Sequence, residues 1–383
     1  MPAARGWSGG ALRSLMENMG SHPLRWWLLI VLVLTAPAPW AADYEDAKQA
    51  LADGQREQAL NRFAQLAADG DARAQFMLAG MYERGDGVTP DPEQALTWYH
   101  KSAALGHGPA EQRLAEAFDK RSEGKGDKAE ARKWFGRAAL HGVSSAVTRL
   151  QAYAEQGDVE AQLQLGRMYF HGRGVIRSEN DAYGWFRRAA EQNAEEAIFA
   201  IGRMYERGRG REQSYGEAVA AYQRASALGY LPATYNLARL YRLGQGIGAN
   251  ADMARLLYER AAEGGSRAAQ VSLAMLYEAG GNWPRDHARA VHWYRQAVAL
   301  GSAEAALNLG YLYALGRGVE KDVVEAYALF SAAASHGQGL AKGNLAELRH
   351  SLSATQKAEA ELRAGNYLVA VSTPATRSPS AAP

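Results

Sequence analysis

One residue pattern returns along most of this 383-residue chain at a spacing of 36 residues. Each unit opens on an alanine, carries leucine or isoleucine four positions later, and in the full units carries tyrosine or phenylalanine eight positions later. Counting that alanine as position 0, units begin at Ala74, Ala110, Ala161, Ala197, Ala233, Ala269 and Ala305, with a partial unit at Ala341. The spacing is interrupted once, by 15 additional residues at 146–160.

The positions that recur predict two helices in each unit. Positions 0, 4, 5 and 8 fall on one face of a first helix, here called helix A, and positions 21, 24, 25 and 28 on one face of a second, helix B. Alanine at position 21 of every full unit lets the two helices approach closely. Gly-x-Gly at positions 11 and 13, as in Gly85 and Gly87, predicts a left-handed cap on helix A and a turn into helix B. A motif repeated in this way builds the fold and is not a single phosphate-binding loop.

A helical hairpin of this size cannot bury both of its faces, whereas stacked neighbours can. The sequence therefore predicts an all-α protein: a right-handed α/α superhelical solenoid of about seven 36-residue helical hairpins, with capping helices at both ends. Two loops depart from the pattern, since Arg121 and Glu123 replace the glycines of one unit and Gly280-Gly281-Asn282-Trp283-Pro284 follows helix A of another.

The pattern A-x-x-x-L-G-x-M-Y-x-x-G-x-G-V, followed by A-x-x-W-Y-x-x-A-A-x-x-G, resembles the Sel-one-like repeat, a relative of the tetratricopeptide repeat. The resemblance covers about residues 74–352. It implies a solenoid that binds other proteins. Bacterial periplasmic members support exopolysaccharide-secretion machines, restrain sensor kinases or bind host factors, and the residues here do not choose among these roles.

The period also predicts the organisation of the chain. We expect the insertion at 146–160 to hold a single helix and to split the solenoid into two arcs, roughly 43–145 and 161–368. Ser353 and Gln356 have the spacing of a capping box that begins a closing helix. The predicted segments are a tetratricopeptide-like hairpin at 43–73, repeats at 74–145 and 161–340, capping helices at 341–368 and a disordered tail at 369–383.

The first 42 residues resemble a targeting segment. Arg25 precedes an apolar run from Trp26 to about Thr35, and small residues and prolines follow. This layout predicts a secretory signal peptide at 1–42, cleaved near Ala41, Ala42 or Asp43, and a periplasmic or secreted protein. The alternative is an uncleaved segment that anchors the chain in the inner membrane, with its body facing the periplasm.

Composition excludes several kinds of site. The chain has no cysteine, which rules out disulfides, thiolate metal sites and cysteine nucleophiles. Beyond residue 42 the basic and acidic residues balance, so charge gives no reason to expect a nucleic acid as partner. The basic run 207–211 contains the turn glycines of its repeat and is interpreted as a solvated loop. No cofactor or metal motif is present, and the histidines are scattered.

One short match suggests a rival function. Ser122 and Lys125 fit Ser-x-x-Lys, and some disulfide-rich members of the repeat family are described as penicillin-binding. This alternative would make the protein a cell-wall hydrolase or a penicillin-interacting protein. The Ser-Asp-Asn and Lys-Thr-Gly motifs that accompany such serines are missing, which favours a protein that is not an enzyme.

Residues outside the packing pattern are the ones available to a partner. By resemblance to tetratricopeptide arrays, positions 6, 9 and 10 of helix A point into the concave face. A basic ladder is expected to bind carboxylates of a partner protein or extended peptide, and apolar residues to hold an anchor. The competing interpretation is solvated surface, with Arg203 paired to Glu206. The candidates are Arg167, Arg203, Arg239, His171 and Arg207 for the ladder, and Met275, Tyr311 and Leu315 for the anchor. The sequence thus predicts an exported non-enzymatic scaffold, acting in envelope or exopolysaccharide-secretion assembly or in signalling.

Overall fold

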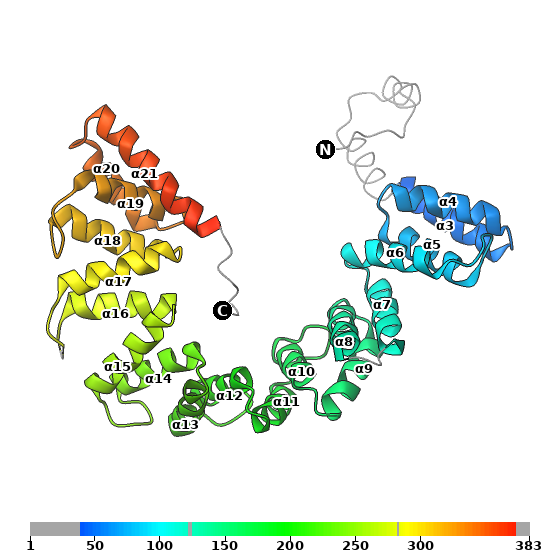
Figure 1. Ribbon diagram of the computed structural model, residues 1–383, viewed down its shortest axis with the longest axis horizontal. Coiled ribbons are helices and arrows are strands. Elements are labelled where there is room, and N and C mark those ends of the chain that lie inside the picture. Colours follow the sequence, from blue (N-terminus) through cyan, green and yellow to red (C-terminus); the bar gives the residue numbers. More distant parts are fainter. Residues whose placement is uncertain (1–38, 122–124, 282, 373–383) are drawn as a thin grey trace, which may run out of the picture. The chain divides into compact units, whose positions relative to one another are not determined.

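The computed structural model describes residues 39–121, 125–281 and 283–372, and within these ranges the protein is an all-α solenoid. It holds 19 helices there and no strand, as predicted. The chain divides after Arg177 into two compact units. Figure 1 shows the helices of each unit following one another in chain order. Residues 1–38 of the predicted signal segment (1–42), Ser122 and residues 373–383 lie outside the described residues.

The first unit contains a helical pair before the repeats, two complete repeats, one single helix and helix A of the next repeat. Its helices are α3 (Pro39–Ala52), α4 (Arg56–Ala68), α5 (Ala72–Arg84), α6 (Pro92–Ala104), α7 (Gly108–Lys120), α8 (Lys125–Leu140), α9 (Ser144–Glu155) and α10 (Val159–His171). The predicted cleavage positions therefore fall at the start of α3.

The second unit begins with helix B of that repeat. Its helices are α11 (Glu179–Glu191), α12 (Glu195–Arg207), α13 (Tyr215–Ala227), α14 (Leu231–Leu243), α15 (Ala251–Glu263), α16 (Arg267–Ala279), α17 (His287–Ala299), α18 (Ala303–Leu315), α19 (Val323–Ser335), α20 (Gly339–Arg349) and α21 (Ala354–Ser372). Helices α12, α14, α16 and α18 are helices A, and α13, α15, α17 and α19 are the matching helices B. No helix in 39–121, 125–281 or 283–372 is both long and apolar enough to cross a membrane.

The structure explains why both positions of the Gly-x-Gly motif require glycine. Gly244 caps α14 with φ 67° and ψ 28°, the left-handed conformation that the sequence predicted. The second glycine does more than turn the chain, because a Cβ on Gly246 would lie 2.3 Å from the carbonyl carbon of Tyr215 in the preceding helix B. In the unit that begins at Ala269, which lacks the second glycine, buried Trp283 takes over this junction, and its indole N–H donates to the Ala251 carbonyl at 3.1 Å.

A hydrogen bond to a backbone carbonyl fastens each of six helices to an earlier helix, and it is made in two ways. In three repeats the amide of a buried glutamine donates to a carbonyl near the end of the preceding helix, over 2.8–3.1 Å: Gln75 to Ala67, Gln162 to Ala154 and Gln270 to Ala262. In three others an arginine from helix B donates instead: Arg137 to Ala103, Arg224 to Ala190 and Arg260 to Ser226. Either donor satisfies a buried carbonyl that would otherwise cost free energy.

The insertion holds the single helix α9, which keeps the period of the preceding repeats. Ala146 lies 36 residues after Ala110 and Leu150 lies 36 after Leu114, so α9 has the pattern of a helix A without its helix B. Helix α10 contacts both α9 and α8. The sequence had indicated a division of the chain around the insertion. The structure divides after Arg177 instead.

The C-terminal helix closes the second unit. Ser353 and Gln356 form the predicted capping box, with their side chains accepting from each other's backbone N–H at 3.2 and 2.9 Å. Helix α21 packs along α19, with buried Ala360 and Ala364 against Ala328, and Figure 1 shows it beside α19 and α20. The helix runs through Ser372, so the prediction of disorder from residue 369 is wrong for residues 369–372.

Candidate partner-binding surface

A recurring hydrogen bond links helix B to the polar side of helix A. Tyrosines at position 25 donate to a carboxylate at position 9 of the same repeat: Tyr99 to Glu83 at 2.8 Å, Tyr222 to Glu206 at 2.6 Å and Tyr294 to Glu278 at 2.9 Å. Burial raises the pKa of Tyr99 to about 12, so its hydroxyl remains a donor at neutral pH. These hydrogen bonds from the tyrosines hold the three carboxylates in a fixed position.

Arginines of the following helix A compensate some of these carboxylates. Arg113 lies 2.9 Å from Glu83, and Arg239 donates to Glu206. The charge of Arg239, a predicted member of the ladder, is therefore already paired within the protein. The alternative pair predicted for Glu206, with Arg203, does not form, because Glu206 is engaged by Tyr222 and Arg239.

Arg203 has no acidic side chain within ion-pair distance among the described residues. Its guanidinium lies 5.9 Å from the ring centre of Phe199. The pKa of Arg203 is lowered, first by partial burial and then by the positive charge of Arg207. Arg207 is exposed and likewise has no ion pair in the described ranges. A carboxylate from a partner would oppose both effects on this pKa, because an opposite charge favours the charged guanidinium.

Arg167 and His171 lie on α10, in the first unit. Arg167 is paired with Glu160 at 3.7 Å. The second unit holds the other predicted residues. Of the three arginines expected at position 6, Arg203 is therefore the one without an acidic partner in the described part of the chain.

The sequence interpretation missed Arg242 and Glu278, which occupy position 9 on α14 and α16. Arg242 is exposed, hydrogen bonds to the hydroxyl of Tyr258 and has no acidic partner among the described residues. Glu278 has no cationic partner there. A signal existed, since position 9 holds Glu83, Asp119 and Glu206 in other repeats and basic Arg242 in this one.

Four apolar side chains on the same helices A are exposed. Tyr311, Met275 and Leu315 were predicted, and their exposed fractions are 38%, 46% and 56%; Leu243 is 45% exposed. Tyr311 is held in place by an edge-to-face contact with Phe330 at 5.3 Å and by donating to Asn344 at 3.1 Å. We define the stripe as the eight residues Arg203, Arg207, Arg242, Leu243, Met275, Glu278, Tyr311 and Leu315.

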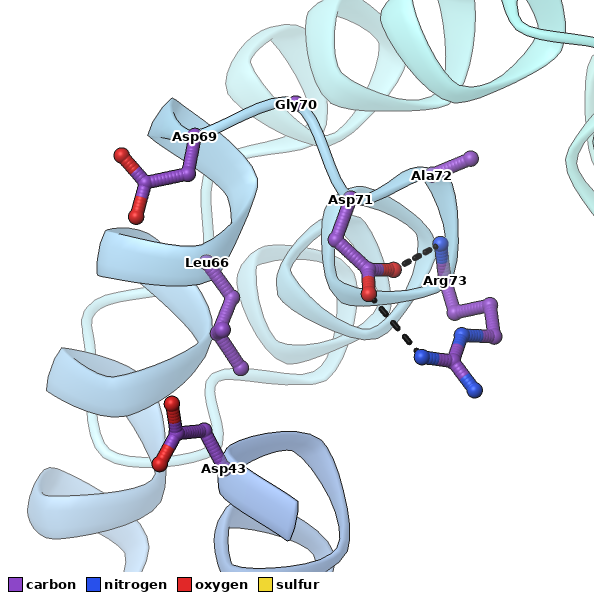
Figure 2. Close-up of a pocket in the computed structure, with 7 residues that line it drawn as sticks. All are labelled: Asp43, Leu66, Asp69, Gly70, Asp71, Ala72 and Arg73. Atoms are coloured by element: carbon purple, nitrogen blue, oxygen red, sulfur yellow. Dashed lines mark hydrogen bonds and ion pairs between the residues drawn. The ribbon is translucent and has the colours of Figure 1, made fainter. Parts of the chain in front are cut away.

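The first unit has a surface pocket of about 550 Å³ between α3, α4 and α5 (Figure 2). Its carboxylates are Asp43, Asp69 and Asp71. Asp71 already caps α5, accepting from the backbone N–H of Arg73 at 2.8 Å and from its guanidinium at 3.0 Å. Although burial opposes it, these bonds lower the pKa of Asp71. The pocket is thus explained by helix capping.

Comparison with known proteins agrees with this architecture. The model of the Sel1 repeat matches residues 72–107, 108–143, 159–193, 195–230, 231–266, 267–302 and 303–338. No curated protein matches the chain. Sel1 repeat proteins typically mediate protein–protein interactions.

Solved structures are similar as well. A Sel1 repeat protein from Oxalobacter formigenes is 27% identical over 91% of this chain and 97% of its own, with a TM-score of 0.50. A protective antigen of uropathogenic Escherichia coli displaying an SLR fold is 25% identical over 87% of this chain and 84% of its own, with a TM-score of 0.39. With seven matched segments at the period of its helical pairs, the chain belongs to the Sel1 repeat family.

Proposed function

We propose that this protein is an exported, non-enzymatic scaffold that binds another protein through the stripe on helices α12, α14, α16 and α18. The observation that carries the proposal is that four exposed apolar side chains lie on the same helices A as three arginines without acidic partners in the described residues, two of them exposed and Arg203 partly buried. The family generally lacks enzymatic activity and mediates protein–protein interactions, which supports the same reading.

The composition of the stripe suits a binding surface. Arginine, tyrosine and methionine are enriched at the centres of protein interfaces, where aromatic and arginine side chains supply much of the binding free energy. Each square ångström of apolar surface that a partner covers contributes roughly 25 cal/mol. Because Tyr311 is already held by Phe330 and Asn344, little of its side-chain entropy is lost on binding.

Export is supported by the sequence of residues 22–42, with its arginine, apolar run and small residues. We place the scaffold in the periplasm, where it helps to assemble an envelope machine such as one for exopolysaccharide secretion, or a signalling complex. Mass measurement of the mature N-terminus tests export with cleavage. A mass that retains residues 1–42 would instead indicate an anchored protein.

Affinity capture from the native envelope tests the binding surface. The variant Leu243→Ser/Met275→Ser/Leu315→Ser should lose the partner that the unchanged protein captures, at an unchanged melting temperature. The matched control is Leu228→Ser/Leu256→Ser/Leu300→Ser, which removes leucines that are 38–59% exposed outside the stripe. The control should retain the partner. Equal capture by both triple variants, or equal loss, would overturn the assignment.

A further inference from the structure

We infer that the stripe binds a polyproline-II segment that presents carboxylates at one end and a lysine or arginine at the other, with an apolar residue between them. The inference rests on the proposed function and adds the chemistry of the ligand. It derives from a charge pattern that three repeats keep and that two neighbouring repeats break with a charged residue left over; the other two repeats carry uncharged Phe170 and Ala314 at the same position.

The pattern is a carboxylate at position 9 that pairs with an arginine of the next helix in the stack. Glu83 pairs with Arg113 at 2.9 Å, and Glu206 with Arg239. Asp119 and Arg149 make the same pair between α7 and α9. Where the pattern holds, neighbouring helices neutralise each other, and no charge is left for a ligand.

Helices α14 and α16 break the pattern in opposite senses. On α14 position 9 is Arg242, and the place that Arg239 fills beside Glu206 is taken on the next helix A by Met275. On α16 position 9 is Glu278, held by Tyr294 at 2.9 Å, and the corresponding place on α18 is taken by Tyr311. One cation and one anion therefore lie one repeat apart, without ion pairs among the described residues.

A ligand can complete both pairs. A carboxylate suits the guanidinium of Arg242, and a second one suits Arg203, because arginine binds carboxylates through two parallel hydrogen bonds. An ammonium or guanidinium suits Glu278, and the exposed ring of Tyr311 offers the same cation a favourable face. Leu243 lies beside Arg242 on α14 and Met275 lies on α16 with Glu278, and both suit an apolar side chain of the ligand.

The repeat spacing selects the backbone conformation of the ligand. Side chains of neighbouring helices A meet directly, as Tyr235 and Ser272 do at 3.3 Å, and helices in such contact lie about 8–10 Å apart. A polyproline-II segment advances about 3.1 Å per residue and returns to the same face every third residue, after about 9 Å. A β-strand instead presents every second residue on one face, at about 7 Å. Every third residue of a polyproline-II ligand therefore meets the next repeat.

Binding of two labelled peptides to the full chain, followed by fluorescence anisotropy, tests the inference. The peptide DPADPLKPA places two aspartates and a lysine at every third position, and KPAKPLDPA reverses each charge. The first should bind at least tenfold more tightly. Equal affinity for the two peptides, or no binding of either, would overturn the inference.

Charge exchange separates direct contact from a general electrostatic effect. Arg242→Glu should weaken binding of DPADPLKPA about tenfold, and replacing the second aspartate of the peptide with lysine should restore it. Glu278→Lys should weaken binding similarly, with recovery when the lysine of the peptide becomes aspartate. Arg255→Glu on α15 is the charge-matched control, since Arg255 is 41% exposed and outside the stripe. Loss of binding in that control, or absence of recovery, would contradict the assigned contacts.

The two proposals fail separately. If the leucine and methionine variant loses its native partner while the peptides show no charge preference, the scaffold function stands and the ligand chemistry is wrong. If the peptides follow the charge exchange while native capture is unaffected, the surface has the inferred chemistry and the proposed function is wrong.

Discussion

At the scale of single residues, Glu111 shows how one repeat binds the carbonyl of an earlier helix when a charged residue replaces the buried glutamine. It occupies the position where other repeats carry the buried glutamine, and its side chain is fully buried. A carboxylate cannot donate to the Ala103 carbonyl, so Arg137 does so at 3.0 Å and also lies 2.9 Å from Glu111. His141 contacts the other carboxylate oxygen at 2.6 Å. The guanidinium thus serves both a carbonyl and a buried charge.

We therefore expect Arg137→Leu to lower the free energy of unfolding by about 2 kcal/mol, less than for a fully buried pair, because Arg137 is partly exposed and His141 remains. Adding Glu111→Gln to this variant should recover most of the loss, since a glutamine there donates to the carbonyl as Gln75 and Gln270 do. Urea unfolding of both variants measures this. A double variant no more stable than Arg137→Leu would refute the equivalence of the two fastenings.

His107 gives the first unit a dependence on acid. Its pKa is lowered, first by burial, with Asp71 and Glu111 opposing and Arg73 assisting. A histidine with a lowered folded pKa binds its proton more readily when unfolded. Stability should therefore be unaffected well above pH ~6.5, the ordinary histidine pKa, and should fall as the pH drops below it.

Urea midpoints at pH 7 and pH 5 measure this effect. The midpoint of the unchanged protein should fall more over that interval than the midpoint of His107→Leu. The exposed His292, replaced by leucine, is the matched control and should leave the pH dependence of the unchanged protein in place. An identical fall in all three proteins would remove His107 as the cause.

At the scale of elements, the second turn glycine sets the distance between repeats. A Cβ on Gly246 would meet the backbone of Tyr215 at 2.3–2.4 Å, whereas Gly229, which also has positive φ, has open space around it. Both positions strain a non-glycine backbone. They differ in what the added methyl group would touch.

Gly229→Ala should consequently cost about 1–2 kcal/mol, the strain of a left-handed alanine. Gly246→Ala should cost about 2 kcal/mol more, because the loop must also move away from α13. Thermal unfolding of the two variants compares them directly. Equal destabilisation would mean that the close approach contributes nothing beyond the backbone conformation.

The sequence predicted helices and caps well because those depend on neighbours within one repeat. The left-handed Gly244 follows from local geometry, and the capping box at Ser353 from a spacing of three residues. Whether a charged side chain forms an ion pair depends instead on the residues of the neighbouring repeat and on the direction of the side chain. Arg239 and Arg242 lie on one helix, yet only Arg239 pairs with Glu206, and the repeat pattern does not say which arginine reaches a carboxylate of the preceding repeat.

At the scale of the whole molecule, the single helix α9 is an addition to an otherwise regular stack. Removing residues 144–158 would make the distance from Ala110 to Ala161 equal to 36 residues and join α8 to α10 by the usual short connection. The cost includes the ion pair between Arg132 and Asp158 at 2.7 Å. Regular neighbours would replace the contacts of α9.

We expect this shortened chain to fold, with a helical far-UV circular dichroism spectrum and a single monodisperse species on size-exclusion chromatography. Deleting 159–173 instead removes α10 and its cap, and should give an aggregated or partly unfolded protein. Similar behaviour of the two deletions would show that the period does not govern which segments are dispensable.

The side-chain donor that fastens one helix to an earlier one belongs, in every case described, to the later of the two elements, whether it is the amide of Gln270 or the guanidinium of Arg224. A gene segment that encodes one repeat therefore also encodes the attachment of that repeat to whatever precedes it. Unequal recombination between such segments can lengthen or shorten the protein without stranding a polar group at the new boundary.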